Sequence, residues 1–208
     1  DGEWENDKSE IRSFKYGYWT IGHVLATGLV IPGRGKIYSF PDVQAYLTFF
    51  TEILVRQSAS KYQLELATLY CDFVLKQPDP KSVPLLIPEY RYDGLQKKHK
   101  YRLDFLIINP YTMDKVGFEL SPWSTHGMLS GTASKSQKQI NEIACDNFER
   151  EVEKQRSFFK KHNITVLIYS DKSLKDIRSV FESDILPLLT PDVPDGGISF
   201  RVMEEFLA

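Results

Sequence analysis

The segment KYRLDFLIINPYTMDKVGFELSPWSTHG (residues 100–127) contains two strongly apolar runs, and each run holds one acidic residue. The runs, residues 101–108 and 115–120, have the length and apolar content of β-strands, and an Asn-Pro turn between them indicates an antiparallel hairpin. Asp104 lies in the first run and Glu119 in the second. Because a buried carboxylate is costly unless it is paired, these two charges need a chemical explanation.

The chain before this hairpin is predicted to contain two helices and one more strand. Helical periodicity begins at Asp42 and again at Ser60, whose spacing to Gln63 is that of a capping box. Residues 85–92 then form a strand candidate, separated from the hairpin by a basic tip that contains glycine. The three consecutive strands therefore predict an antiparallel meander.

The chain after the hairpin returns to the sheet through one long helix. Helical spacing of apolar residues extends from about residue 135 to 161, and a short apolar run at 164–170 follows it. A helical crossover of this length favours a parallel pairing of residues 164–170 with residues 115–120. With an amphipathic helix from Ser173, the predicted fold class is α/β, in the order helix, three strands, helix, strand, helix.

Length and composition indicate one principal domain. The chain has 208 residues, of which 42% are hydrophobic, and this is enough to bury a sizeable core. Residues 1–41 are aromatic and interrupted by glycine, and we expect them to form an N-terminal extension of short strands. Residues 42–208 carry the predicted α/β domain.

Charge and cysteine content restrict the class of protein. The net charge of −2 is unlike that of a basic nucleic-acid coat, so any contact with a polyanion needs a local positive surface. Cys71 and Cys145 fall in helical segments, which favours free thiols and a reducing cytoplasm. No apolar run is long enough to cross a bilayer, so no membrane association is expected. The chain starts at Asp1 without a leader, which indicates a processed protein or a fragment.

The two acids are expected to converge at one end of the sheet. Side chains alternate between the two faces of a strand, so Asp104 should share its face with Leu106 and lie opposite Leu103 and Phe105. If the strands are neighbours, Asp104 and Glu119 can share a divalent cation. Oxygen ligands suit Mg²⁺ or Mn²⁺, and such an ion can polarise a phosphodiester and activate a water.

This arrangement resembles the restriction-endonuclease-like PD-(D/E)XK phosphodiesterase superfamily. The resemblance covers roughly residues 60–170: a helix, an acid in a strand, a hairpin, a glutamate in the next strand and then a helix-strand unit. It implies a metal-dependent nuclease acting on DNA, most simply an endonuclease, with Mg²⁺ or Mn²⁺ as cofactor. Asp104 corresponds to the first metal-binding acid and Glu119 to the second. A protein partner or a homodimer is also compatible with the resemblance.

The resemblance also assigns further catalytic candidates. Ser121 stands where the superfamily has a lysine that positions the attacking water or stabilises charge in the transition state. Since that residue can migrate in the superfamily, Lys135 and Lys138 on the following helix are candidates to replace it. By analogy with nucleases of the mismatch-repair type, His126 is a candidate general acid or substrate contact.

Additional acids and cations are candidates for the same site. The superfamily often adds one more acid, and Glu89 in the first strand and Glu65 in the preceding helix are the candidates. A surface or capping charge is the alternative interpretation of both. The basic tip before the hairpin could contact phosphates, although such a tip at a hairpin turn is more often a solvated loop. Its cations are Lys97, Lys98, Lys100 and Arg102.

Two other functions are compatible with the sequence. The serine at position 121 allows a catalytically silent module of the same fold, which binds nucleic acid or a protein partner within a larger assembly. A second alternative is an α/β interaction domain in which the strand acids form ordinary ion pairs, for example between Asp104 and Arg102.

Overall fold

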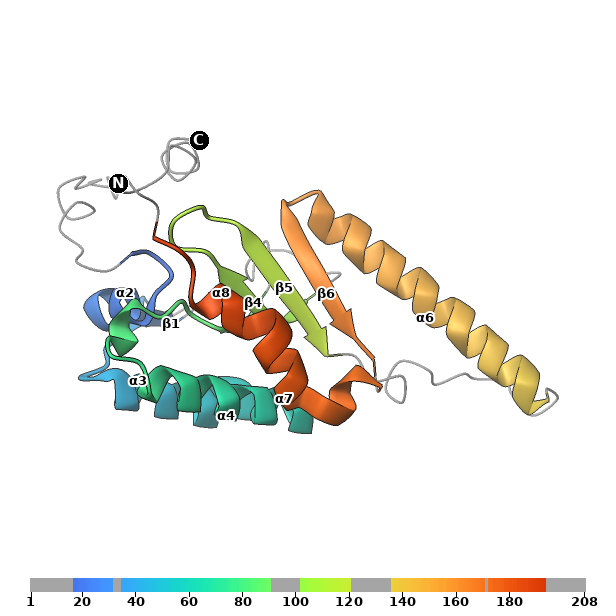
Figure 1. Ribbon diagram of the computed structural model, residues 1–208, viewed down its shortest axis with the longest axis horizontal. Helices are drawn as coiled ribbons and strands as arrows, with labels where there is room; N and C mark the ends of the chain where they lie inside the picture. Colours follow the sequence, from blue (N-terminus) through green and yellow to red (C-terminus); the bar gives the residue numbers. More distant parts are fainter. Residues whose placement is uncertain (1–16, 32–34, 91–101, 121–135, 171, 194–208) are drawn as a thin grey trace.

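A four-stranded mixed β-sheet forms the centre of the protein (Figure 1). The computed structural model describes residues 17–31, 35–90, 102–120, 136–170 and 172–193. The strands are β3 (Ile87–Tyr90), β4 (Leu103–Ile108), β5 (Lys115–Leu120) and β6 (Ile164–Tyr169). They lie in the order β3, β4, β5, β6; the first two pairings are antiparallel and the last is parallel. The predicted meander with a parallel fourth strand is therefore confirmed.

Helical segments cover both faces of this sheet. Phe105 on β4 belongs to a core cluster with Leu66 and Ile177, which come from helices before and after the sheet. Leu106, the next residue on the strand, belongs to a second cluster with Phe159 of the long helix. The main helices are α2 (Ile21–Thr27), α3 (Val43–Phe49), α4 (Lys61–Leu75), α6 (Gln137–Lys160), α7 (Ile177–Val180) and α8 (Leu186–Leu189). Together these elements make a mixed α/β protein.

The described part of the N-terminal region is both helical and extended. The strands β1 (Leu29–Ile31) and β2 (Lys36–Tyr38) form the expected hairpin, but α2 occupies a segment that we predicted as strand. That prediction was wrong because Thr20 caps a helix there, with its side chain accepting a hydrogen bond from the N–H of His23. Ile21 and Val24, three residues apart, turn inward on one face, so this region contributes to the main core.

The helix predicted from Asp42 is confirmed and continues beyond α3. Asp42 caps α3 by accepting a hydrogen bond from the N–H of Ala45 at 2.8 Å. The chain then passes without a break through the π-helical segment η1 (Phe50–Val55) and the 3-10 turn η2 (Arg56–Ser58). This helical stretch leads to Ala59, which has a left-handed backbone, and then to the start of α4.

The start of α4 differs from the prediction in one side chain. Ser60 caps the helix as expected, because its hydroxyl accepts a hydrogen bond from the N–H of Gln63. The reciprocal half of the capping box is replaced by another contact, since the Gln63 side chain is buried and donates to Asp104. A residue predicted to stabilise a helix end thus connects α4 to the sheet.

The long helix α6 is confirmed at nearly its predicted length. It begins with a true capping box between Ser136 and Gln139, which sequence analysis had not recognised. Figure 1 shows that its beginning projects away from the sheet, whereas its last turn leads into β6. Phe159 in that last turn is fully buried. Within the described residues, no helix has the length and apolar character needed to span a membrane.

Candidate functional site

The pairing of β4 with β5 ends beside Asp104 and Glu119. The register pairs Phe105 with Phe118, and the two acids are the next residues on their strands. Asp104 Oδ2 accepts a hydrogen bond from the backbone N–H of Leu120 at 2.7 Å. The side chain of Asp104 therefore binds a backbone donor at the end of the two strands, and the residue is only 9% exposed.

The second oxygen of Asp104 is bound by Gln63 of α4. The Nε2 amide of Gln63 donates to Asp104 Oδ1 at 2.6 Å, and both side chains are buried. Sequence analysis missed Gln63 as a site residue because its spacing from Ser60 had already explained it as a capping residue. Both oxygens of Asp104 thus accept hydrogen bonds from neutral donors, which fix the position of the carboxylate.

The alternation of side chains is interrupted where Asp104 lies. Leu103 belongs to the same core cluster as Leu106, whereas strict alternation predicted that it shares a face with Phe105. The pairing register does not explain this error, because it stays regular: Pro88 pairs with Phe105 and Tyr90 with Leu103, so Glu89 lies opposite Asp104 with no inserted residue.

Glu89 has a left-handed backbone with a φ of 53°, which an extended strand does not have. Both strands therefore change phase at the Glu89 and Asp104 positions. This change allows Asp104 to contact α4 while Leu103 turns to the opposite face of the sheet. On that face Leu103 lies over Gly117, where an added Cβ would be 2.5 Å from Leu103 Cδ1. Because Phe118 and Leu120 belong to the cluster of Phe105, strand alternation puts Glu119 on the same face as Gly117 and Leu103. The charge of Glu119 therefore acts on Asp104 around the end of the two strands and not across one face of the sheet.

The electrostatics of the strand end centre on Asp104. Burial raises the pKa of Asp104 to about 7, and the negative charges of Glu119 and Glu89 contribute in the same direction. The hydrogen bond from the Leu120 N–H and the positive charge of Arg102 oppose the increase in pKa. Three acids on neighbouring strands therefore interact, and Asp104 changes its protonation state near neutral pH.

Glu89 and Arg102 form an ion pair at the border of this site. The guanidinium Nη1 of Arg102 lies 2.8 Å from Glu89 Oε2, and both side chains are partly exposed. The other oxygen of Glu89, Oε1, is buried and accepts no hydrogen bond from any described residue. The sequence had suggested Arg102 as a phosphate contact or as a partner of Asp104. Its direct partner is Glu89, and it acts on Asp104 through its charge.

The structure does not bring every candidate to this site. Glu65 is exposed on α4, and because it follows Gln63 by two positions it points to a different side of the helix. Lys138 is exposed in the first turn of α6, the end of the helix that projects away from the sheet (Figure 1). The other candidates lie outside the described residues: Lys97, Lys98, Lys100, Ser121, His126 and Lys135.

The donor set at the strand end consists of oxygen atoms. Within the described ranges, no group of three or more His, Cys, Asp or Glu residues is arranged to hold a metal ion. Asp104 and Glu119 nevertheless repel each other, and the buried Oε1 atoms of Gln63 and Glu89 have no hydrogen-bond donor among the described residues. Carboxylate and amide oxygens are donor types that Mg²⁺ uses, together with water and phosphate oxygens.

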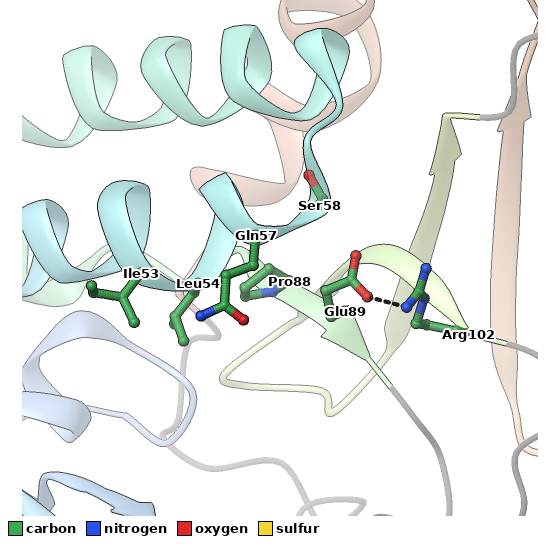
Figure 2. Close-up of a pocket in the computed structure, with 7 residues that line it drawn as sticks. All are labelled: Ile53, Leu54, Gln57, Ser58, Pro88, Glu89 and Arg102. Atoms are coloured by element: carbon green, nitrogen blue, oxygen red, sulfur yellow. Dashed lines mark ion pairs between the residues drawn. The ribbon is translucent and has the colours of Figure 1, made fainter.

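A pocket of about 440 Å³ adjoins the same strand end (Figure 2). Glu89 and Arg102 line it, so it shares two residues with the electrostatic surroundings of Asp104.

Searches of family descriptions, of curated proteins and of solved structures each found no match to this chain.

Proposed function

We propose that the protein is a metal-dependent nuclease that hydrolyses phosphodiester bonds in DNA, most simply an endonuclease. The observation that carries this proposal is Asp104, whose pKa is raised to about 7 by burial and by the neighbouring acids Glu119 and Glu89. A carboxylate with such a pKa is an unfavourable charge that a bound cation would stabilise. Perturbed titratable groups of this kind are concentrated at functional sites.

The topology of the sheet supports the same proposal. The sheet carries acids on consecutive strands, with a helix before them and a helix and a parallel strand after them. This order of elements resembles that of restriction-endonuclease-like proteins. On this basis the strand end of β4 and β5 is the candidate active site, with Asp104 as the first acid and Glu119 as the second.

In the proposed mechanism, Asp104 and Glu119 would hold Mg²⁺ or Mn²⁺, and Glu89 Oε1 or Gln63 Oε1 would be available as a further ligand. When bound, the cation acts as a Lewis acid toward the phosphate. Gln63 and the Leu120 N–H hold the Asp104 carboxylate in one orientation. The raised pKa leaves the Asp104 carboxyl group partly protonated near neutral pH. Binding of the cation would therefore release a proton from it.

Arg102 is the described cation best placed to assist such a reaction. The positive charge of its guanidinium lowers the pKa of Asp104, and its ion pair with Glu89 fixes its position. From this position it can stabilise negative charge on a phosphate near the strand end. This role does not depend on Lys138, which lies on the projecting end of α6. Ser121, Lys135 and His126 stay candidates from the sequence.

A cleavage assay tests the proposal. Supercoiled plasmid and single-stranded DNA would be incubated with the protein in Mg²⁺, in Mn²⁺ and in EDTA. We expect divalent-dependent cleavage, and a loss of at least about a hundredfold in Asp104→Asn and in Glu119→Gln. Glu65→Gln, which changes an exposed glutamate of α4, is the matched control and should cleave like the wild type. Absence of cleavage, or equal loss in the control, would contradict the proposal.

The alternative is a catalytically silent module of the same fold that binds nucleic acid or a protein partner. It is favoured by one observation: both oxygens of Asp104 already accept hydrogen bonds, so this carboxylate can serve the structure alone. The same cleavage assay distinguishes the nuclease from the silent module. A silent module should bind DNA or a partner without cleaving any substrate, and its binding should not depend on Mg²⁺.

A further inference from the structure

The pocket beside the strand end is built by three separate segments of the chain (Figure 2). The helical stretch before α4 provides one wall, β3 provides another, and the residue before β4 closes the third side. The lining residues are Ile53, Leu54, Gln57, Ser58, Pro88, Glu89 and Arg102. Its volume of about 440 Å³ lies in the range of pockets that hold small organic groups, roughly 300–1,000 Å³.

The lining combines an apolar surface with a few polar groups. Ile53, Leu54 and Pro88 supply the apolar part, and Ile53 is 47% exposed although it is a large aliphatic residue. Gln57 presents its amide on the same side as Leu54 and Pro88 (Figure 2). An amide can both donate and accept hydrogen bonds, so it can pair with the polar edge of a planar ring that lies on the apolar surface.

The backbone around the pocket has two uncommon conformations. Ile53 and Leu54 belong to the π-helical segment η1, and Glu89 has the left-handed backbone described above. Short π-helical segments occur frequently at functional sites, and left-handed non-glycine residues are also concentrated there. The π-helical segment is separate in the chain from the acids, whereas the left-handed residue is one of them, so the two features join the pocket wall to the strand end.

The charged end of the pocket faces the candidate active site. Arg102 and Glu89 line the pocket; Arg102 is two residues before Asp104 in the chain, and Glu89 lies opposite Asp104 on the paired strand β3. A group in the pocket is therefore next to the strand end, and a phosphate attached to that group can reach the Arg102 guanidinium. Arginine is well suited to such a contact, because its planar fork of donors matches phosphate oxygens.

We infer that the pocket binds one unstacked nucleobase of the DNA strand that is to be cut, with Arg102 contacting an adjacent phosphate. The placement of this base next to the cleaved bond rests on the proposed nuclease function. The base lies against Ile53, Leu54 and Pro88, and Gln57 bonds to its edge. Because a base inside a duplex is stacked and paired, the pocket selects single-stranded or locally unpaired DNA.

Binding measured in EDTA tests this inference without any cleavage. The probes are a fluorescently labelled oligothymidylate, the same backbone with abasic sites in place of the bases, and a duplex of the same length. We expect the oligothymidylate to bind at least about tenfold more tightly than the abasic strand and more tightly than the duplex. Equal binding of the oligothymidylate and the abasic strand would overturn the inference.

Variants with matched controls locate the contact. Ile53→Ala combined with Gln57→Ala should weaken oligothymidylate binding about fivefold or more and leave binding of the abasic strand unchanged. Leu75→Ala is the control for the apolar residue, because Leu75 is 50% exposed and lies outside the pocket. If the double variant and the control bind alike, the pocket is not the site of the base.

The phosphate contact has its own measurement. Arg102→Gln should make the negative slope of log K against log salt concentration shallower by about 0.7, the value for one contact to single-stranded DNA. Arg56→Gln is the control, since Arg56 pairs with Glu52 on the same helical stretch and does not line the pocket. An unchanged slope in Arg102→Gln would contradict the phosphate contact.

The inference and the proposed function can fail separately. Base-dependent binding in a protein that cleaves no DNA would retain the pocket and reject the nuclease. Metal-dependent cleavage in a protein whose binding ignores the bases would retain the nuclease and reject the pocket.

Discussion

Asp104 on β4 and Glu89 on β3 are opposite positions of two paired strands, and their surroundings differ in charge. Asp104 is buried and is bound by two neutral donors, the Gln63 amide and the Leu120 N–H. Glu89 is partly exposed and is bound by the Arg102 guanidinium. Hydrogen bonds from neutral donors alone do not compensate a buried charge, because the pKa of Asp104 still rises to about 7.

The difference in charge compensation between Asp104 and Glu89 indicates where a cation would bind. The charge of Glu89 is already balanced by Arg102, so Glu89 attracts an added cation less strongly than Asp104 does. At Asp104 the described residues provide no direct ion pair, and Glu119 adds a second negative charge nearby. A divalent cation should therefore bind on the Asp104 side of the two strands.

The largest expected effect is the pH dependence that Asp104 gives to stability. In the unfolded chain Asp104 ionises near its ordinary value of 3.8, and in the folded protein near 7. Between these values the folded state holds one more proton, so the free energy of unfolding falls as the pH rises. Relative to Asp104→Asn, the wild type should lose about 3 kcal/mol between pH 4.5 and pH 8. Urea unfolding at several pH values measures this difference.

A parallel pH dependence in the wild type and in Asp104→Asn would contradict this difference between Asp104 and Glu89. It would show that the buried carboxylate is stabilised as well as Glu89 is. Glu65→Gln serves as the control, because removing an exposed acid should leave the pH dependence of the wild type unchanged.

The next largest effect separates the hydrogen bonds of Asp104 from its charge. Asp104→Ala leaves the Leu120 N–H and the Gln63 amide without their acceptor, whereas Asp104→Asn can keep both bonds. In the asparagine variant the Gln63 amide can turn, so that its Oε1 atom accepts from the new side-chain N–H. At pH 8 we expect Asp104→Asn to exceed Asp104→Ala in unfolding free energy by about 2 kcal/mol. Equal stability would show that neither bond contributes.

A smaller effect is expected from Mg²⁺ in the absence of DNA. At a concentration tenfold above its dissociation constant, the ion should raise the free energy of unfolding of the wild type by about 1.4 kcal/mol. Thermal unfolding at pH 8, with and without Mg²⁺, measures the shift. The shift should disappear in Asp104→Asn and persist in Glu65→Gln. A shift of equal size in all three proteins would place the ion elsewhere.

The smallest effect on stability is expected at the Glu89 and Arg102 pair. Because both side chains are partly exposed, a double-mutant cycle with Glu89→Gln and Arg102→Gln should give a coupling below about 1 kcal/mol. The single variants should nevertheless move the pKa of Asp104 in opposite directions, upward in Arg102→Gln and downward in Glu89→Gln. The pH dependence of unfolding of each variant measures these shifts. If neither variant moves that pKa, the two regions are electrostatically independent.

Local patterns in the sequence were sufficient for the elements that carry the site. The apolar runs with short connections predicted β3, β4 and β5 and their pairing, and helical periodicity predicted α4 and α6. The helix at Ile21–Thr27 was missed, because its aromatic and glycine-containing surroundings have the composition of strands and turns. Short patterns with mixed composition therefore gave the weakest predictions.

Local sequence patterns predict the order of strands and helices and the presence of one acid in each central strand, because periodicity and turn residues act between near neighbours in the chain. The surroundings of Asp104 depend instead on contacts made in the folded protein. Gln63 is 41 residues away along the chain and Leu120 is 16 residues away, and the phase change at Glu89 arises on a different strand. The pKa of Asp104 and the pocket depend on burial and on contacts between distant segments, which no local pattern of residues specifies.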